Sequence, residues 1–359
     1  TTVGVADPLE LLAEVTAPTF LDFRGSGCSR RFHTLSFDAA EALVPALRRC
    51  LVSTWAAKLY QGLATSHCAS AREDADLVVL PGYTAVECNW PIYGGGQCSN
   101  TKGGVANSAR EGQLCRGVDT LQAFQHMQST IGKPVLVLEN SPNAAGNKYD
   151  LPNVIGYDAP HVSWALVGTD VAHYRRGMDV SLPPGPTTRC ALSYAKRSFD
   201  QPLEDKAFLA SFKGTLQMHP FRSLARAALH DGKKVVIADT ADARWDFDWL
   251  LQSSIFALVL RGDAIMSFRL NEAICSGGIP VLVTDVWVPP FNETVPFESF
   301  GLVHQEADVN TLRARLEAVS AKRRKHLRSA ARVACEKHFQ KIDAHAATLA
   351  SAINGLTGL

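Results

Sequence analysis

The sequence lacks several features that would place it at once in a broad class. None of its 359 residues belongs to a run of about 18 apolar residues, so no segment predicts a transmembrane helix. The net charge is only +1, which provides no overall field for nucleic acid or a charged bilayer. Cys-x-x-Cys pairs are absent, which disfavours zinc ribbons and thioredoxin-like motifs. We therefore expect a globular protein that does not bind nucleic acid.

The sequence also lacks a complete dinucleotide-binding turn. Gly25-Ser26-Gly27 begins one, but Arg30 stands where the third glycine of Gly-x-Gly-x-x-Gly belongs. This argues against a dinucleotide-dependent oxidoreductase. Internal repeats and low-complexity tracts are absent as well.

The length exceeds one comfortable hydrophobic core, so two domains are expected. Apolar runs of strand length alternate with amphipathic stretches, which predicts parallel sheets covered by helices. A segment rich in proline and polar residues, 183–205, is the candidate linker. We predict domains over 1–195 and 196–359, and the final helical region, 322–353, could pack back on the first domain.

Cysteine is plentiful and sits mostly in the first third of the chain. Three of the nine lie in a glycine-rich segment without clear periodicity, 82–117, where a disulfide would restrain a long loop. This distribution favours an oxidising compartment. Cys275, by contrast, falls within an apolar helical pattern and is interpreted as a small buried hydrophobe. The nine are Cys28, Cys50, Cys68, Cys88, Cys98, Cys115, Cys190, Cys275 and Cys335.

The most informative stretch is 253–291. It begins with a continuous apolar run, 255–260, typical of a strand buried on both faces. A helix is predicted over 268–276 with Ser267 as its cap, and Gly277-Gly278 ends it before the strand 279–283. Such a βαβ unit places a ligand site at the carboxyl end of its first strand.

Polar residues gather at that end. Arg261 and Arg269 offer forked donors suited to a phosphate, and Ser267 lies between them. Glu272 is three residues after Arg269 and suits ribose hydroxyls. The alternative is that Arg269 and Glu272 form a solvated surface pair of little energetic value.

These residues resemble the donor-site signature of exostosin-type glycosyltransferases, family 47. The shared pattern is an arginine and glycine, then Ser-Phe-Arg at 267–269, Glu-Ala at 272–273 and Pro-Val at 280–281. Val-Pro-Pro-Phe at 288–291 resembles the leucine-proline-phenylalanine loop of that family. The likeness covers the last 160 residues or so well and the first 180 only in fragments.

The resemblance implies an α/β protein of the GT-B fold, with two doubly wound Rossmann-like domains facing a cleft. It implies an inverting transferase that uses a nucleotide sugar, with uridine diphosphate (UDP) as the expected carrier. Gly214 would allow close approach to the ligand, and Arg222 would join Arg261 and Arg269 on the diphosphate. Because three arginines can hold the leaving charge, no metal or other cofactor is required. The two Asp-x-Asp triplets, 74–76 and 246–248, are interpreted as structural.

An inverting transferase also needs a base in the first domain, at a strand end. Glu139 directly follows the apolar run 134–138 and is the first candidate. Glu87, in the segment 82–117, is the second. Family members often carry a His-Asp pair in this region, and this chain has Glu139-Asn140 instead.

Two functions of different kinds stay open at this point. One is an active enzyme acting on a glycan or glycoprotein hydroxyl in the Golgi or another secretory lumen. The other is a catalytically silent domain of the same fold that serves as a partner subunit or glycan-binding module. The sequence begins at Thr1 without methionine, so we expect part of a longer protein. A type II membrane anchor would then lie outside these residues, and an oligomer is compatible with the sequence.

Overall fold

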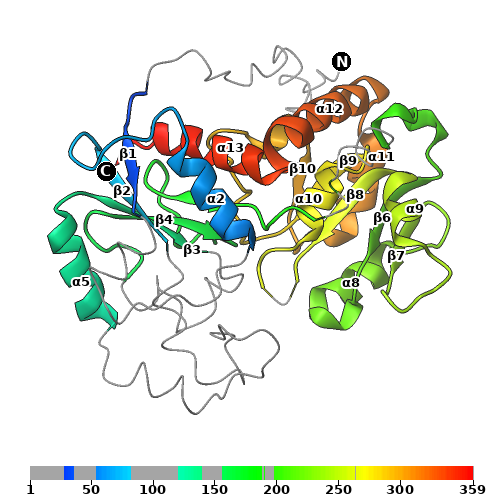
Figure 1. Cartoon of the computed structure of the whole chain (residues 1–359). Coiled ribbons are helices and arrows are strands. Elements are labelled where there is room, and N and C mark those ends of the chain that lie inside the picture. Colours follow the sequence, from blue (N-terminus) through cyan, green and yellow to red (C-terminus); the bar gives the residue numbers. More distant parts are fainter. Residues whose placement is uncertain are drawn as a thin grey trace, which may run out of the picture.

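The computed structural model consists of two α/β units, each built on a parallel five-stranded sheet (Figure 1). It describes residues 28–35, 54–81, 120–139, 156–187, 190, 198–262 and 264–358. The α/β class and the GT-B arrangement predicted from the sequence are confirmed. Residues 19–23, most of the stretch 39–63 and the segment 82–117 lie outside these residues.

The first unit has the strand order β1-β2-β3-β4-β5, with every neighbouring pair parallel. Its side chains alternate between two apolar clusters because successive strand residues point to opposite faces. Trp164 and Leu166 pack against α5, whereas Ala165 and Val167 lie on the opposite face. The elements are β1 (Phe32–Thr34), α2 (Thr54–Ala64), β2 (Leu77–Pro81), α5 (Thr120–Ile131), β3 (Val135–Glu139), β4 (Val162–Val167) and β5 (Val180–Leu182).

The second unit has the order β10-β9-β8-β6-β7, again fully parallel. Its strands are continuous apolar runs because helices cover both faces. Its elements are β6 (Phe208–Lys213), α8 (Pro220–Leu229), β7 (Val235–Ala238), α9 (Phe247–Gln252), β8 (Ser254–Leu260), α10 (Arg269–Ile274), β9 (Ile279–Val283), β10 (Leu302–His304), α11 (Leu312–Ala318), α12 (Ala321–Ala334) and α13 (Ile342–Asn354).

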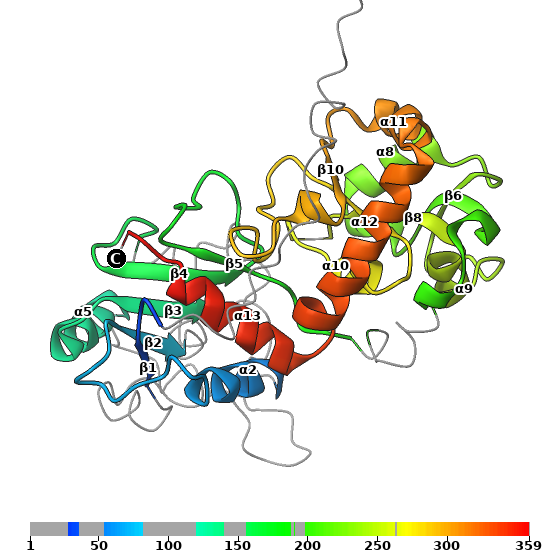
Figure 2. The same ribbon diagram turned by 90° about the horizontal axis from the view of Figure 1, so that it is seen from above.

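The last helix returns to the first unit (Figure 2). A π-helical segment, Cys335–Phe339, separates α12 from α13. Leu349 and Ile353 of α13 share an apolar cluster with Leu59 of α2. A Cβ on Gly62 would lie 2.5 Å from the Cβ of Ala346, so the two helices approach closely because residue 62 is glycine. The predicted helical region 322–353 is thus two helices, of which the second covers the first sheet.

Two disulfides are formed among the described residues. Cys28 is bonded to Cys68, and Cys275 to Cys335. The interpretation of Cys275 as a simple hydrophobe was wrong. The apolar pattern around it correctly predicted burial, but its partner lies 60 residues away and is reached only through packing. Cys190 is buried and free, whereas Cys88, Cys98 and Cys115 lie outside the described residues.

Candidate functional site

The candidate site lies at the carboxyl ends of β6 and β8. The chain runs from β6 to β7 on one side of β6 and returns to β8 on its other side, so the strand order reverses there. Ligands of open parallel sheets bind at such reversals, outside the carboxyl ends of the strands. The predicted donor-site residues come from the segments that follow these two strands: Gly214, Arg222, Arg261, Ser267, Arg269 and Glu272.

Arg222 joins the two segments. Its Nε donates to the carbonyl oxygen of Arg261 at 2.7 Å, and its Nη1 donates to that of Thr215 at 2.9 Å. The side chain is buried, and its guanidinium lies 5.1 Å from the ring centre of Phe212. A Cβ on Gly214 would lie 2.7 Å from Cζ of Phe212, so this glycine leaves room for the aromatic ring that the guanidinium covers. Arg222 therefore positions the edge of the sheet in addition to contributing positive charge.

Arg269 and Glu272 form an ion pair that is mostly withdrawn from water. The side chain of Glu272 is 3% exposed, so the alternative of a solvated surface pair does not describe it. Arg269 also donates from Nε to the carbonyl oxygen of Lys213 at 3.0 Å, and its guanidinium lies 4.0 Å from the ring centre of Phe247. These contacts hold the start of α10 against the end of β6.

The helix after β8 is shorter than predicted. It begins at Arg269 and ends at Ile274, instead of spanning 268–276. Phe268 occupies the N-cap position without a side-chain cap, although the buried Ser267 Oγ accepts from the Arg269 backbone N–H at 3.3 Å. Ser267 therefore orders the turn one residue earlier than a regular cap would.

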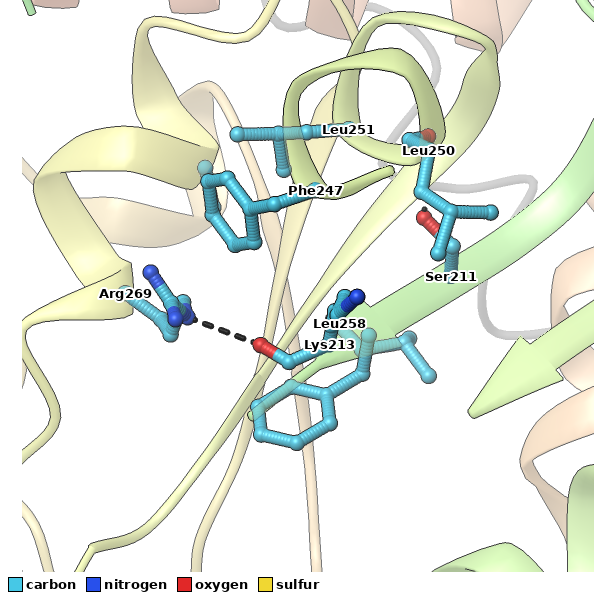
Figure 3. Close-up of a pocket in the computed structure, with 9 residues that line it drawn as sticks. Ser211, Lys213, Phe247, Leu250, Leu251, Leu258 and Arg269 are labelled. Carbon is cyan, nitrogen blue, oxygen red and sulfur yellow. Dashed lines mark hydrogen bonds between the residues drawn. The ribbon is translucent and has the colours of Figure 1, made fainter. Parts of the chain in front are cut away.

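A small hollow adjoins Arg269 (Figure 3). It encloses about 250 Å³, including its open mouth. Phe247 and Leu251 of α9 form one wall and Lys213 of β6 lies opposite, while Arg269 closes a side. The hollow thus continues the candidate site between α9 and α10.

Sequence reasoning missed Glu306, which lies two residues after β10 at the same edge of the sheet. Its Oε2 is 3.9 Å from Nη1 of Arg261. Glu306 Oε1 and Arg261 Nε are both buried without a hydrogen-bond partner in the described part of the chain. Burial raises the pKa of Glu306 to about 7, with Asp285 adding to the rise and Arg261 opposing it. An acid two residues after a strand that ends at this edge was the available signal.

The raised pKa of Glu306 predicts a specific dependence of stability on pH. The folded protein binds this proton more tightly than the unfolded chain does, so stability should fall as pH rises from about 4.5 to about 7. Glu306→Gln, which stays neutral, should therefore raise the free energy of unfolding at pH 8 by about 1–2 kcal/mol. This value is smaller than the full pKa shift implies because solvent screens a partly exposed group. At pH 5 it should have little effect.

Urea unfolding of both proteins at the two pH values would measure this difference. Glu317→Gln, which removes a more exposed carboxylate of the same unit, serves as the control. Equal stabilisation by Glu306→Gln at pH 5 and pH 8 would contradict the pKa assignment.

The candidates for the base are only partly visible. Glu139 is the last residue of β3, where its backbone pairs with Leu166 of β4, but its side chain is not described. Glu87 lies outside the described residues.

One aspartate of each Asp-x-Asp triplet has a backbone partner: Asp76 accepts from Arg31 N and Asp246 from Trp249 N, both at 2.7 Å.

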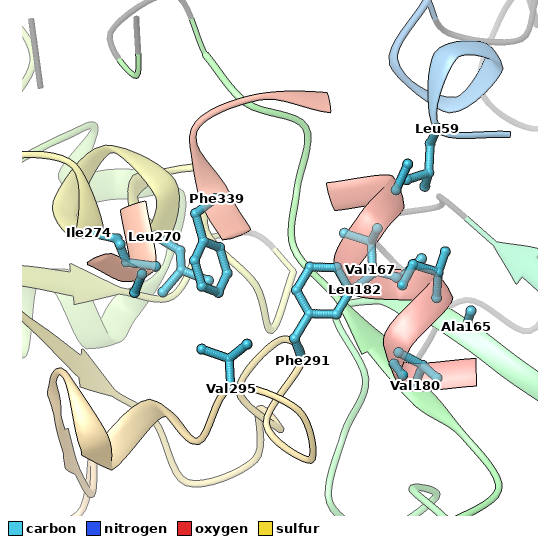
Figure 4. Close-up of a cluster of buried hydrophobic side chains, with 14 of the residues drawn as sticks. Leu59, Ala165, Val167, Val180, Leu182, Leu270, Ile274, Phe291, Val295 and Phe339 are labelled. Carbon is cyan, nitrogen blue, oxygen red and sulfur yellow. The ribbon is translucent and has the colours of Figure 1, made fainter. Parts of the chain in front are cut away.

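The two units are joined by the segment after β9 (Figure 4). Phe291 packs against Phe339 and belongs to the cluster that contains Val167 and Leu182 of the first unit. Its backbone N–H donates to the carbonyl oxygen of Ser181 at 2.8 Å. The Val-Pro-Pro-Phe loop recognised in the sequence therefore forms part of the contact between the units.

Comparison with known proteins supports the resemblance seen in the sequence. Residues 155–319 match the family model of the exostosin GT47 domain. An exostosin-1 homolog of Caenorhabditis elegans is 29% identical over 220 residues, covering 54% of this chain and 57% of the relative. Exostosin-1 of Drosophila melanogaster is 29% identical over 217 residues, covering 53% of this chain and 28% of the relative. The chain thus matches less than two thirds of either relative.

Among solved structures, Anabaena HepE in complex with UDP overlaps with a TM-score of 0.39 at 11% identity, covering 90% of this chain and 98% of the other. WaaG, a glycosyltransferase involved in lipopolysaccharide biosynthesis, overlaps with a TM-score of 0.35 at 12% identity, covering 91% and 100%. Both TM-scores are below 0.5, so these overlaps carry no argument. The resemblance to exostosins rests on the sequence matches and on the donor-site signature at the reversal of the second sheet. Residues 155–319 therefore match the exostosin GT47 domain, and the chain resembles exostosins over about half of its length.

Proposed function

We propose that this protein is an inverting glycosyltransferase that moves a sugar from a UDP-linked donor to a hydroxyl of a glycan or glycoprotein. The observation that carries the proposal is the set of three arginines, Arg222, Arg261 and Arg269, on two segments that meet at the strand reversal. Positive groups fixed before the reaction stabilise the charge that develops on a departing diphosphate. On this proposal the donor needs no metal to neutralise it.

The remaining donor-site residues have separate roles in this proposal. Glu272 accepts hydrogen bonds from the ribose, and Gly214 and Ser267 shape the approach to the diphosphate. Glu139 and Glu87 are the bases suggested by the sequence alone. We retain 1–195 as the acceptor-side domain and 196–359 as the donor-side domain.

The cellular setting is part of the same proposal. Two disulfides among the described residues are typical of proteins that fold in an oxidising lumen. We place the protein in the Golgi or a related secretory compartment, attached through an anchor outside these residues. Within the described part of the chain, no helix is both long and apolar enough to cross a bilayer.

The central test is UDP binding. Isothermal titration should show that the wild type binds UDP and that Arg269→Ala weakens binding at least tenfold, about 1.4 kcal/mol. Arg269→Lys should recover only part of the loss because lysine lacks the planar fork of donors. Arg332→Ala removes a more exposed arginine of the same unit and should leave the affinity unchanged.

Thermal unfolding of each variant would separate lost binding from lost folding. Normal UDP affinity in a folded Arg269→Ala variant would refute the donor site. UDP binding without turnover on any donor and acceptor would favour the alternative, a silent domain that acts as a partner subunit or glycan-binding module.

A further inference from the structure

The turn that follows β4 holds a histidine and an aspartate in direct contact. Nδ1 of His173 lies 2.9 and 2.8 Å from the two carboxylate oxygens of Asp170. One of those oxygens also accepts from the backbone N–H groups of Ala172 and His173, at 2.8 and 3.0 Å. The aspartate therefore fixes the turn and the imidazole together.

This contact determines which nitrogen of His173 is available. A carboxylate only accepts hydrogen bonds, so Nδ1 carries the hydrogen and the neutral ring keeps a lone pair on Nε2. The ring stacks on Tyr157, with ring centres 4.2 Å apart and planes 22° apart. The His173 side chain is 44% exposed, against 12% for Asp170. An oriented imidazole with an accessible basic nitrogen is the arrangement that general-base catalysis requires.

The turn also lies where the two units meet. The backbone of Asp170 bridges to Trp287, and Val171 N donates to the carbonyl oxygen of Val286 at 2.8 Å. Tyr174 Oη donates to Glu293 at 3.2 Å. The segment 286–293 follows β9. This strand lies beside β8, and Arg261 comes directly after β8. The histidine is thus on a first-unit loop held against the donor-side unit.

We propose that His173, oriented by Asp170, is the general base that activates the acceptor, an assignment that rests on the proposed transferase function. Nε2 takes the proton of the acceptor hydroxyl as that oxygen bonds to the anomeric carbon of the donor sugar. The bond from this carbon to the diphosphate oxygen breaks, and its electron pair leaves on UDP. The imidazolium then returns its proton to water.

Glu139 is the natural competitor for this role. It ends β3, the strand beside β4, and so reaches the same edge of the first sheet. The two assignments predict different results, because only replacement of the base should abolish turnover while leaving UDP binding intact. His126, an exposed histidine on α5, provides a matched control in the same unit.

The experiment measures UDP release from a panel of UDP-sugars, with water or simple glycosides as acceptors, together with UDP affinity by titration. His173→Gln should lower kcat by about 10²- to 10⁴-fold with UDP affinity unchanged. Asp170→Asn, which keeps the turn but not the charge, should lower kcat at least tenfold. Imidazole added to His173→Ala should restore part of the turnover, which a purely structural residue would not show. His126→Gln should behave like the wild type.

The outcomes separate the base from the proposed function. A folded His173→Gln variant with kcat within threefold of the wild type would overturn the base, and loss of turnover in Glu139→Gln alone would reassign it. If the wild-type protein binds UDP but turns over no combination of UDP-sugar and acceptor, the assignment of His173 as the base is contradicted. The UDP-binding site would be unaffected by that result. Failure of the wild type to bind UDP would instead overturn the proposed function.

Discussion

Replacing both Cys275 and Cys335 with alanine should lower the free energy of unfolding by about 4 kcal/mol. The bond closes a loop of 60 residues, and its loss releases the unfolded chain from that restraint by about this amount in the chain-entropy model. Both side chains are completely buried, so alanine avoids placing an unpaired hydroxyl in the core. In the folded protein the disulfide links the end of α10 to the start of the π-helical segment, from which the chain crosses to the first unit.

Urea denaturation of the double variant and the wild type would measure the loss. Cys190→Ala, which removes a buried free thiol, controls for the change in side-chain volume. The double variant should also bind UDP less tightly, since α10 carries Arg269 and Glu272. Equal stability of the double variant and the wild type would show that packing alone holds the two segments together.

Gly277→Ala should destabilise the protein by about 2–5 kcal/mol, the sum of a left-handed backbone and an overpacked contact. Gly277 has a φ of +75°, a backbone conformation that residues other than glycine adopt only at a cost in free energy. Its new Cβ would lie 2.0 Å from the carbonyl oxygen of Ser198 and 2.2 Å from the carbonyl carbon. Because those atoms are backbone, the strand β9 or the segment at 198 must move.

The control for this variant is Gly232→Ala in the same unit. Gly232 has a similar φ of +68°, but the nearest atom to its new Cβ is 3.9 Å away. Gly232→Ala should lower the free energy of unfolding only by the cost of the left-handed backbone conformation, about 1–2 kcal/mol. Thermal or urea unfolding would compare the two, and equal losses would rule out the contact with Ser198 as the cause.

Local pattern was sufficient for much of the second unit. The apolar run 255–260 and the glycines at 277–278 predicted a strand, a helix and a second strand, and the structure has β8, α10 and β9 there. Periodicity and turn residues determine such elements because they reflect interactions between near neighbours in the chain. Their ends were less well predicted, since Ser267 orders a turn before the helix instead of capping it.

Contacts between distant residues were decided only by tertiary packing. The sequence predicted that Cys275 is buried, but which cysteine it meets depends on how α12 and α13 lie across both units. The same holds for Glu306 beside Arg261, which are brought together because β8 and β10 end at one edge of a parallel sheet. The contact between Asp170 and His173 spans three residues, yet its position against segment 286–293 requires the two units to be assembled. Local sequence determines strands and helices, whereas the partners that give a side chain its chemistry are selected by the packing of the whole chain.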